Sequence, residues 1–172
     1  MISLTNHIPE DALLWRNNPI IQKWCRQYTL ISLAQHKKWL EKIETDPSIK
    51  MFGIVNRKRS NEEHEIGVCG FTSIDKHNQS AEFSLYIAAH VQRQGFGKRA
   101  LRALFEHGFL HMNFNRIWGE MFEGNPAEKT FITLGLKKEG TLRKSHYREG
   151  RFIDSHIYAI LRNDWVCSTQ DT

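Results

Sequence analysis

One stretch limits the fold of this chain most strongly, the segment Gln92-Arg93-Gln94-Gly95-Phe96-Gly97-Lys98. Residues 81–88 before it alternate between apolar and polar side chains, as in a strand, and apolar residues recur at helical spacing after it. Glycine permits a positive φ and a close approach of the backbone to a ligand. The first N–H groups of a helix have no partner within the helix and favour an anion. A strand, a glycine loop and a helix in this order predict a phosphate-binding site.

The length of 172 residues fits one domain, spanning 1–172, that buries a substantial core. No apolar run approaches the roughly 20 residues needed to cross a bilayer, and the N-terminus lacks the pattern of a secretory signal, so we expect no membrane partner. Cys25, Cys69 and Cys167 are widely spaced and no pair has metal-ligand spacing. This usage favours a reducing compartment, and we expect a cytoplasmic protein without a metal.

The formal net charge of +5 indicates an anionic partner only weakly, because the basic residues are spread along the chain. A nucleic-acid-binding protein usually concentrates its basic residues on one face. A phosphorylated small ligand accounts for the excess equally well. We therefore expect no nucleic-acid partner.

The remaining patterns predict a single-domain α/β fold with a mixed, mostly antiparallel central sheet and helices on both faces. Ser32 and Gln35 form a capping-box pattern, and Asn125 before Pro126 is typical of a helix start. Gly135 is expected to end that second helix. The expected helices cover residues 10–15, 20–24, 32–44, 101–113 and 125–134, and the expected strands cover residues 51–55, 65–72, 81–88, 116–122, 136 onward and 152–161.

Three phosphate motifs compete for the glycine loop. A Walker A loop is rejected, because Lys98 is followed by Arg99 and Gln92 stands where its first glycine belongs. The dinucleotide pattern G-x-G-x-x-A is met by Gly95, Gly97 and Ala100, with Glu120 about 20 residues further on. However, that motif belongs directly after a strand, near the start of its fold. The third motif, Q/R-x-x-G-x-G/A, is met at every specified position.

The third motif and its surroundings resemble the GNAT family of N-acetyltransferases. The matching segments share the order of one branch, which holds ribosomal-protein N-terminal, spermidine and amino-sugar acetyltransferases. These segments are Trp15–Pro19, Ile31–Leu40, Ser80–Ile87, Gly140–Arg143 and Tyr147–Asp154. The resemblance covers roughly residues 10–165.

The resemblance implies transfer of an acetyl group from acetyl-CoA, with no metal, to a primary amine. The backbone groups of Leu85, Tyr86 and Ile87 would pair with the pantetheine arm, and Asn125, besides capping its helix, would contact CoA. The loop would hold the pyrophosphate. Its expected CoA-binding residues are Gln92, Arg93, Gln94, Gly95, Phe96, Gly97 and Lys98.

Only a neutral amine attacks a thioester, and most alkylamines are protonated at neutral pH, so a base is useful. Glu82 is the first candidate and Glu120 the second, with His146 and His36 as further options. The resemblance also suggests acceptor contacts by Trp15, Arg16, His36 and Tyr147. Because His36 lies on the apolar stripe of its helix, its spacing favours a core histidine over an acceptor contact.

The chain departs from the family at the general acid. Many members carry a tyrosine where this chain has Phe131 or Ile132. A hydroxyl elsewhere could substitute, or the CoA thiolate could leave without a dedicated acid. The alternative hydroxyls belong to Thr130, Thr133, Tyr86 and Tyr147.

No acidic cluster is evident for a basic protein N-terminus, so a small-molecule amine is the first expectation for the acceptor, such as a nucleotide-linked amino sugar or a polyamine. A ribosomal-protein-type N-terminal acetyltransferase is the alternative within the family. A non-catalytic acyl-CoA sensor, supported by the missing tyrosine, and a nicotinamide-dependent oxidoreductase are the alternatives from other classes. A homodimer is also an option.

Overall fold

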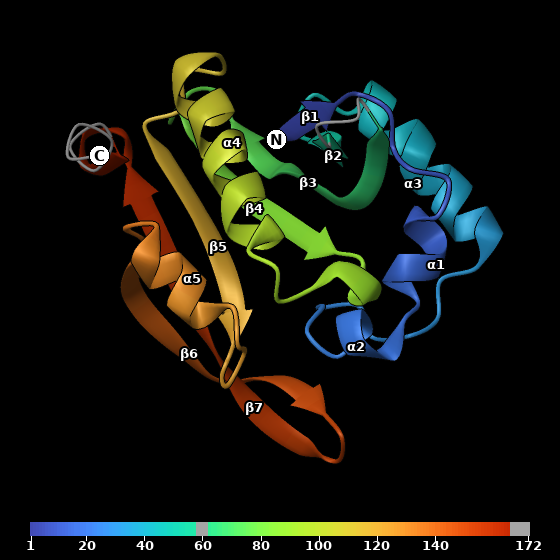
Figure 1. Cartoon of the computed structure of the whole chain (residues 1–172). Helices are drawn as coiled ribbons and strands as arrows, with labels where there is room; N and C mark the ends of the chain where they lie inside the picture. The colour runs from blue at the N-terminus through green and yellow to red at the C-terminus, as the bar shows by residue number, and fades with distance from the viewer. Residues whose placement is uncertain (58–61, 166–172) are drawn as a thin grey trace.

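The computed structural model describes residues 1–57 and 62–165, and its centre is a twisted sheet (Figure 1). The strand order is β1-β2-β3-β4-β5-β7-β6, and every neighbouring pair is antiparallel except β4 and β5. The strands are β1 (Ile2–Thr5), β2 (Lys50–Arg57), β3 (Glu63–Asp75), β4 (Ser80–Ile87), β5 (Arg116–Phe122), β6 (Lys137–Arg148) and β7 (Arg151–Leu161). The expected mixed, mostly antiparallel sheet is confirmed, and it is not the parallel sheet of a dinucleotide-binding fold.

Helices cover both faces of this sheet. One side carries α4 (Phe96–Leu110) and α5 (Glu128–Thr133), whose apolar side chains join the main core with Phe71 and Phe83. A smaller cluster on the other side joins Ala12 and Trp39 to Val68 and Tyr86. The helices on this side are α1 (Ala12–Arg16), α2 (Pro19–Gln22) and α3 (Leu33–Thr45), and a short 3-10 turn, η1 (Ala89–Val91), follows β4. No helix within residues 1–57 and 62–165 has the length and apolarity to cross a membrane.

The parallel pair in the middle of the sheet separates along its length. β4 and β5 are paired only from Ser80, opposite Arg116, to Glu82, opposite Trp118. Beyond Glu82, β4 continues to Ile87 in register with β3, and β5 continues in register with β7. The two strands therefore diverge beneath α4 (Figure 1). Beyond Glu82, one edge of β4 is therefore not paired with β5. In a continuous sheet, the backbone N–H and C=O groups of alternate residues on this edge would bond the neighbouring strand.

Two local expectations need correction. The helical spacing around His36 predicted a core histidine, but α3 contains no buried residue, and His36 is half-buried with its ring stacked on Trp39. The regular part of α5 begins at Glu128 rather than at Pro126. The Asn125 side chain still caps the preceding turn, because its Oδ1 accepts the N–H of Ala127 at 2.9 Å. Cys167 lies outside the described residues.

Candidate active site

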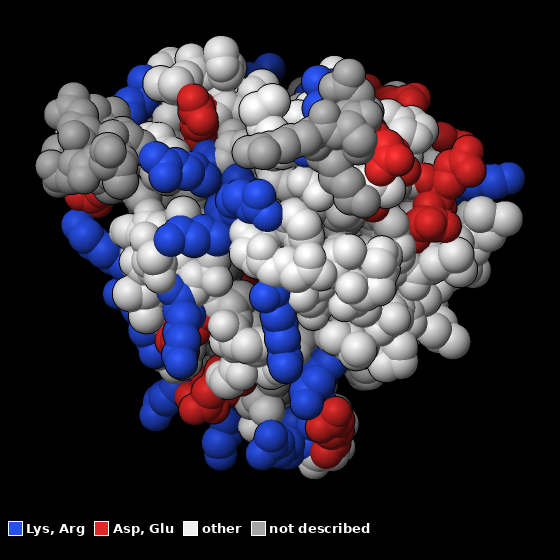
Figure 2. Space-filling view, viewed as in Figure 1, with Lys and Arg blue, Asp and Glu red and all other residues white. Residues whose placement is uncertain are grey.

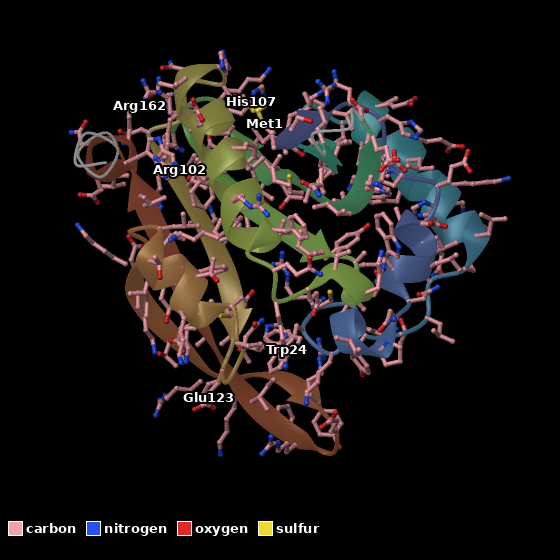
Figure 3. The ribbon with its side chains drawn as sticks, viewed as in Figure 1. Met1, Trp24, Arg102, His107, Glu123 and Arg162 are labelled. Carbon is pink, nitrogen blue, oxygen red and sulfur yellow. The ribbon has the colours of Figure 1, made fainter. Side chains whose placement is uncertain are left out.

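A cleft of about 790 Å³ lies where β4 and β5 diverge. Its walls come from β4, the end of β5, the start of α4, the α5 turn, and the segment from α1 to α3. In Figure 3, Trp24 lies between α2 and the lower end of β5, above the β6–β7 hairpin. The cleft thus joins the glycine loop to an N-terminal wall that includes Arg16, Trp24 and His36.

The glycine loop has the geometry of an anion site. Arg93 and Gly95 have φ values of 61° and 76°, and Gly95 is the N-cap of α4 without a side-chain cap. The N–H of Arg99 bonds to the Gly95 carbonyl at 3.3 Å, whereas the N–H groups of the three residues between them have no partner one turn earlier in the helix. Gly95, Gly97 and Lys98 line the cleft. Free N–H groups at a helix start, with Lys98 beside them, suit a pyrophosphate.

The neighbouring edge of β4 suits an extended amide-bearing arm. Leu85, Tyr86 and Ile87 line the cleft and pair with β3 on one side only. Their unpaired edge faces the divergence, where an amide could add in the manner of a further strand. Gln92 supports this corner, because its Nε2 donates to the Ile87 carbonyl at 2.9 Å. The loop and the strand edge together fit the pyrophosphate and pantetheine of CoA.

Two carboxylates face each other across the cleft and share one cation. Glu82 is buried with 5 % of its surface exposed, and its Oε1 accepts a bond of 2.5 Å from Nη2 of Arg26. Nη1 of Arg26 lies 3.6 Å from Oε2 of Glu120. The structure therefore brings together the two predicted candidate bases and adds an arginine between them.

Glu120 belongs to a second polar group that extends away from the cleft. Its Oε1 accepts from Ser155 Oγ at 2.5 Å and lies 2.8 Å from His146 Nε2. Burial alone would raise the pKa of Glu120, but hydrogen bonds from Ser155 and His146, with the charges of His146 and Arg26, lower it below the ordinary value. Glu120 is therefore an ionised carboxylate at neutral pH.

The N-terminal wall is largely aromatic and apolar but carries a buried donor. Arg16 Nη1 is buried and has no hydrogen-bond partner, while its Nη2 reaches the Gln27 carbonyl at 3.4 Å. Tyr86 lies nearby and its hydroxyl donates to the Ala12 carbonyl at 3.4 Å. Burial raises the pKa of Tyr86 well above its usual range, with Arg16 opposing the shift, so its hydroxyl remains protonated. Burial also lowers the pKa of His36, which keeps that ring neutral.

The position of the missing tyrosine is filled by core packing. Phe131 is buried, with its ring 5.1 Å from that of Phe83 and 5.7 Å from that of Tyr158, whereas Ile132 is exposed. Thr130 lines the cleft, but Thr133 Oγ1 donates to the Lys129 carbonyl within its own helix. Of the residues with substitute hydroxyls, Thr130 and Tyr86 line the cleft, and the Tyr86 hydroxyl is bonded to the Ala12 carbonyl.

The other expected site residues divide into two groups. Within the described part of the chain, the cleft lining contains neither Trp15, Gln94 nor Tyr147, and Tyr147 instead packs on Phe152 in the hairpin. Phe96 contributes its ring to the core. The expected residues that line the cleft are Arg16, His36, Glu82, Leu85, Tyr86, Ile87, Gln92, Arg93, Gly95, Phe96, Gly97, Lys98, Glu120 and Asn125.

Sequence reasoning missed Trp24, Arg26 and Arg148. Arg148 Nη2 donates to the carbonyls of Cys25 at 3.0 Å and Arg26 at 2.5 Å, from the far end of the chain. Its guanidinium also lies 4.2 Å from the ring centre of Tyr28. Trp24 and Arg26 lie outside the matching segments, and the contacts of Arg26 and Arg148 join segments that are distant in the sequence.

Comparison with known proteins matches residues 2–133 to a family model described as an acetyltransferase (GNAT) domain. The uncharacterized N-acetyltransferase p20 of Bacillus licheniformis is 33 % identical over 102 residues, which are 59 % of this chain and 57 % of that protein. The spermidine N(1)-acetyltransferase of Vibrio cholerae is 26 % identical over 102 residues, 59 % of each chain. These alignments span little more than half of each relative.

The fold comparison extends over nearly the whole chain. The crystal structure of spermidine N-acetyltransferase from Vibrio cholerae in complex with CoA and spermine superposes with a TM-score of 0.87 at 21 % identity. The match covers 96 % of this chain and 98 % of that one. The similarity shows the same acyl-CoA N-acyltransferase fold, a seven-stranded, mostly antiparallel sheet flanked by helices.

Proposed function

The chain belongs to the GNAT acetyltransferase family, and on this premise we propose that it transfers the acetyl group of acetyl-CoA to the primary amine of a small, anion-bearing acceptor. A nucleotide-linked amino sugar is the acceptor class that fits the cleft best. The observation that carries the choice is the buried, unpartnered Nη1 of Arg16 in the N-terminal wall. A phosphate or carboxylate of the acceptor would satisfy that donor.

The charges of the cleft support the same choice against a polyamine. Among the described residues of the lining, Glu82 and Glu120 are the carboxylates, and both contact Arg26. Basic side chains in the lining are Arg16, Arg26, Arg93 and Lys98. A polyamine carries several cations that need separate anionic partners, and a cleft of this composition repels the second cation.

The mechanism follows from the positions of the chain's own groups. Acetyl-CoA supplies the thioester, which the β4 edge and the glycine loop would hold. Glu82, at the end of the paired part of β4, would accept the proton of the amine while the N–C bond forms and the C–S bond breaks. Backbone N–H groups on the free edge of β4 would stabilise the oxyanion, and the departing CoA thiolate would take its proton from water or from Thr130.

The decisive experiment measures thiol release from acetyl-CoA against four amines: glucosamine, UDP-glucosamine, spermidine and a basic peptide with a free N-terminus. We expect UDP-glucosamine to have the highest kcat/KM of the four. Arg16→Met should reduce the ratio of kcat/KM for UDP-glucosamine to kcat/KM for glucosamine by about tenfold. This factor corresponds to the loss of one charge-assisted hydrogen bond. The matched control, Arg151→Met in the exposed hairpin turn, should leave the ratio unchanged.

Each other outcome identifies a different function. A preference for spermidine or for the peptide would replace the proposed acceptor with a polyamine or a protein N-terminus. Acetyl-CoA binding without turnover on any amine would favour the acyl-CoA sensor. Binding of NAD in place of CoA would overturn the assignment of the loop.

A further inference from the structure

The cation between Glu82 and Glu120 is supplied by the protein itself. Each carboxylate is nearly buried, with side-chain exposures of 6 % and 10 %, and Arg26 contacts both. A positive charge that contacts both carboxylates in a partly dehydrated cleft stabilises the pair. The acceptor amine arrives mostly as an ammonium ion and needs a place beside the same carboxylate.

The segment that carries Arg26 is held by its backbone, independently of the contacts that the Arg26 side chain makes with the two carboxylates. The side chain is 53 % exposed, and it comes from the segment between α2 and α3. The Arg26 carbonyl accepts from Arg148 Nη2 at 2.5 Å, and the neighbouring Cys25 carbonyl accepts from the same nitrogen. The guanidinium can therefore leave the carboxylates by rotation about its own side-chain bonds while the segment stays in place.

We infer that the Glu82–Glu120 pair is the ammonium subsite of the acceptor and that Arg26 is an internal cation occupying it until the acceptor displaces it. This inference rests on the proposed function and adds a specificity-determining residue to it. Arg26 would lower the apparent affinity for every amine by the fraction of time that it occupies the pair. An acceptor gains full access only when it also binds elsewhere, as its phosphate would at Arg16.

The subsite also limits which amines are acetylated. One carboxylate pair accepts one ammonium ion, and the displaced guanidinium remains near the entrance as a positive charge. This charge favours an acceptor whose remaining groups are negative and disfavours one with further cations. Arg26 thus both competes with the amine and selects its substituents.

The test measures binding of a minimal amine without turnover. The probe is n-propylamine, titrated into the CoA-bound protein and followed by NMR. Arg26→Gln should bind it about tenfold more tightly than the wild type, because the internal competitor is gone. Arg26→Lys, which keeps a competing cation, should bind it like the wild type. The double variant Arg26→Gln/Glu82→Gln should lose the gain, and CoA affinity reports that each variant is folded.

Equal or weaker binding of n-propylamine to the folded Arg26→Gln variant would overturn the inference. If this variant fails to fold, ¹⁵N-labelled arginine in the wild type gives the answer. The Arg26 Nε–H signal, assigned from the spectrum of Arg26→Lys, should shift toward that of a free guanidinium as n-propylamine is added. An unmoved signal at saturating amine would contradict displacement. Tighter binding by Arg26→Gln in a protein that acetylates none of the four amines would uphold the subsite and overturn only the proposed function.

Discussion

At the scale of single residues, Glu120 shows how neighbours set the charge of a nearly buried carboxylate. Its pKa is lowered because hydrogen bonds from Ser155 and His146 and the charges of His146 and Arg26 outweigh burial. A folded-state pKa below the ordinary 4.5 stabilises the fold above that pH, and the contribution is lost as the pH falls through the folded-state value.

Glu120→Gln should therefore lower Tm at pH 7, by about 2–4 °C for each kcal/mol lost in a chain of this size. The difference from the wild type should shrink as the pH is lowered from 4.5 toward the folded-state pKa. Thermal melts across this range measure it, with the exposed Glu106→Gln as a control that changes little. A difference in Tm between the two proteins that stayed constant with pH would mean that the charge of Glu120 does not contribute to the stability of the fold.

Glu82, which we propose as the base, lies on β4 where the pairing with β5 ends. Glu82→Gln keeps the shape of the side chain but cannot accept the proton of the amine. We expect kcat to fall on the order of 10²-fold, the usual value of a general base, and its alkaline rise to flatten. The affinity for acetyl-CoA should stay unchanged. A pH profile like that of the wild type would remove Glu82 as the base.

At the scale of secondary-structure elements, the β6–β7 hairpin connects the end of the chain to the N-terminal wall of the cleft. The pairing is irregular between Leu142 and His146, and Asp154 Oδ1 accepts the N–H of Lys144 at 2.8 Å within this bulge. Bulges bend and twist a strand pair. The tip of the hairpin extends below the sheet toward α2 (Figure 1), where Arg148 contacts the segment after that helix.

Arg148→Gln should loosen this segment by removing two charge-assisted hydrogen bonds and the contact with Tyr28. We expect a rise of about fivefold to twentyfold in the KM for the amine, which is 1–2 kcal/mol, and an unchanged affinity for acetyl-CoA. Faster amide hydrogen exchange over residues 24–28 would accompany it. Arg151→Gln, exposed in the same hairpin, is the control, and equal effects of the two changes would refute the role of Arg148.

Helix α4 carries two glycines that differ in how much room a side chain would have. A Cβ at Gly97 would meet Leu85 and Ile87 side chains at 3.8 Å, an ordinary contact, whereas a Cβ at Gly108 would lie 2.7 Å from Phe71 Cζ. Gly97→Val should therefore weaken CoA binding by at least about 10²-fold with little change in Tm, because it fills the cleft beside the loop. Gly108→Val should cost about 1–3 kcal/mol of stability by overpacking. CoA titrations and thermal melts separate the two, and the reverse pattern would mean that the glycine loop does not bind CoA.

At the scale of the whole molecule, the sequence predicted what local patterns control. The strand before the glycine loop, the Ser32 capping box and the turn at Gly135 are all present, because each depends on residues a few positions apart. The His36 prediction was wrong because His36 lines the cleft and stacks on Trp39, while Trp39 and Ile43 are the α3 side chains that pack against the smaller core cluster. The roles of Arg26 and Arg148 could not be predicted from local patterns, because their contacts join residues more than 50 positions apart in the sequence.

The overall charge distribution gives a final prediction. The chain has a formal net charge of +5, and Figure 2 shows most Lys and Arg of the visible face over its left and lower parts, with some acidic residues among them and a group of acidic residues at the upper right. Such a field speeds the arrival of anions and slows that of cations, and salt screens it over about 8 Å at physiological ionic strength. Raising NaCl from 20 to 300 mM (roughly a fourfold change in Debye length) should lower kcat/KM for UDP-glucosamine and raise it for spermidine. Parallel salt series on the two amines measure this, and an identical salt response for both would exclude a basic surface that selects the acceptor.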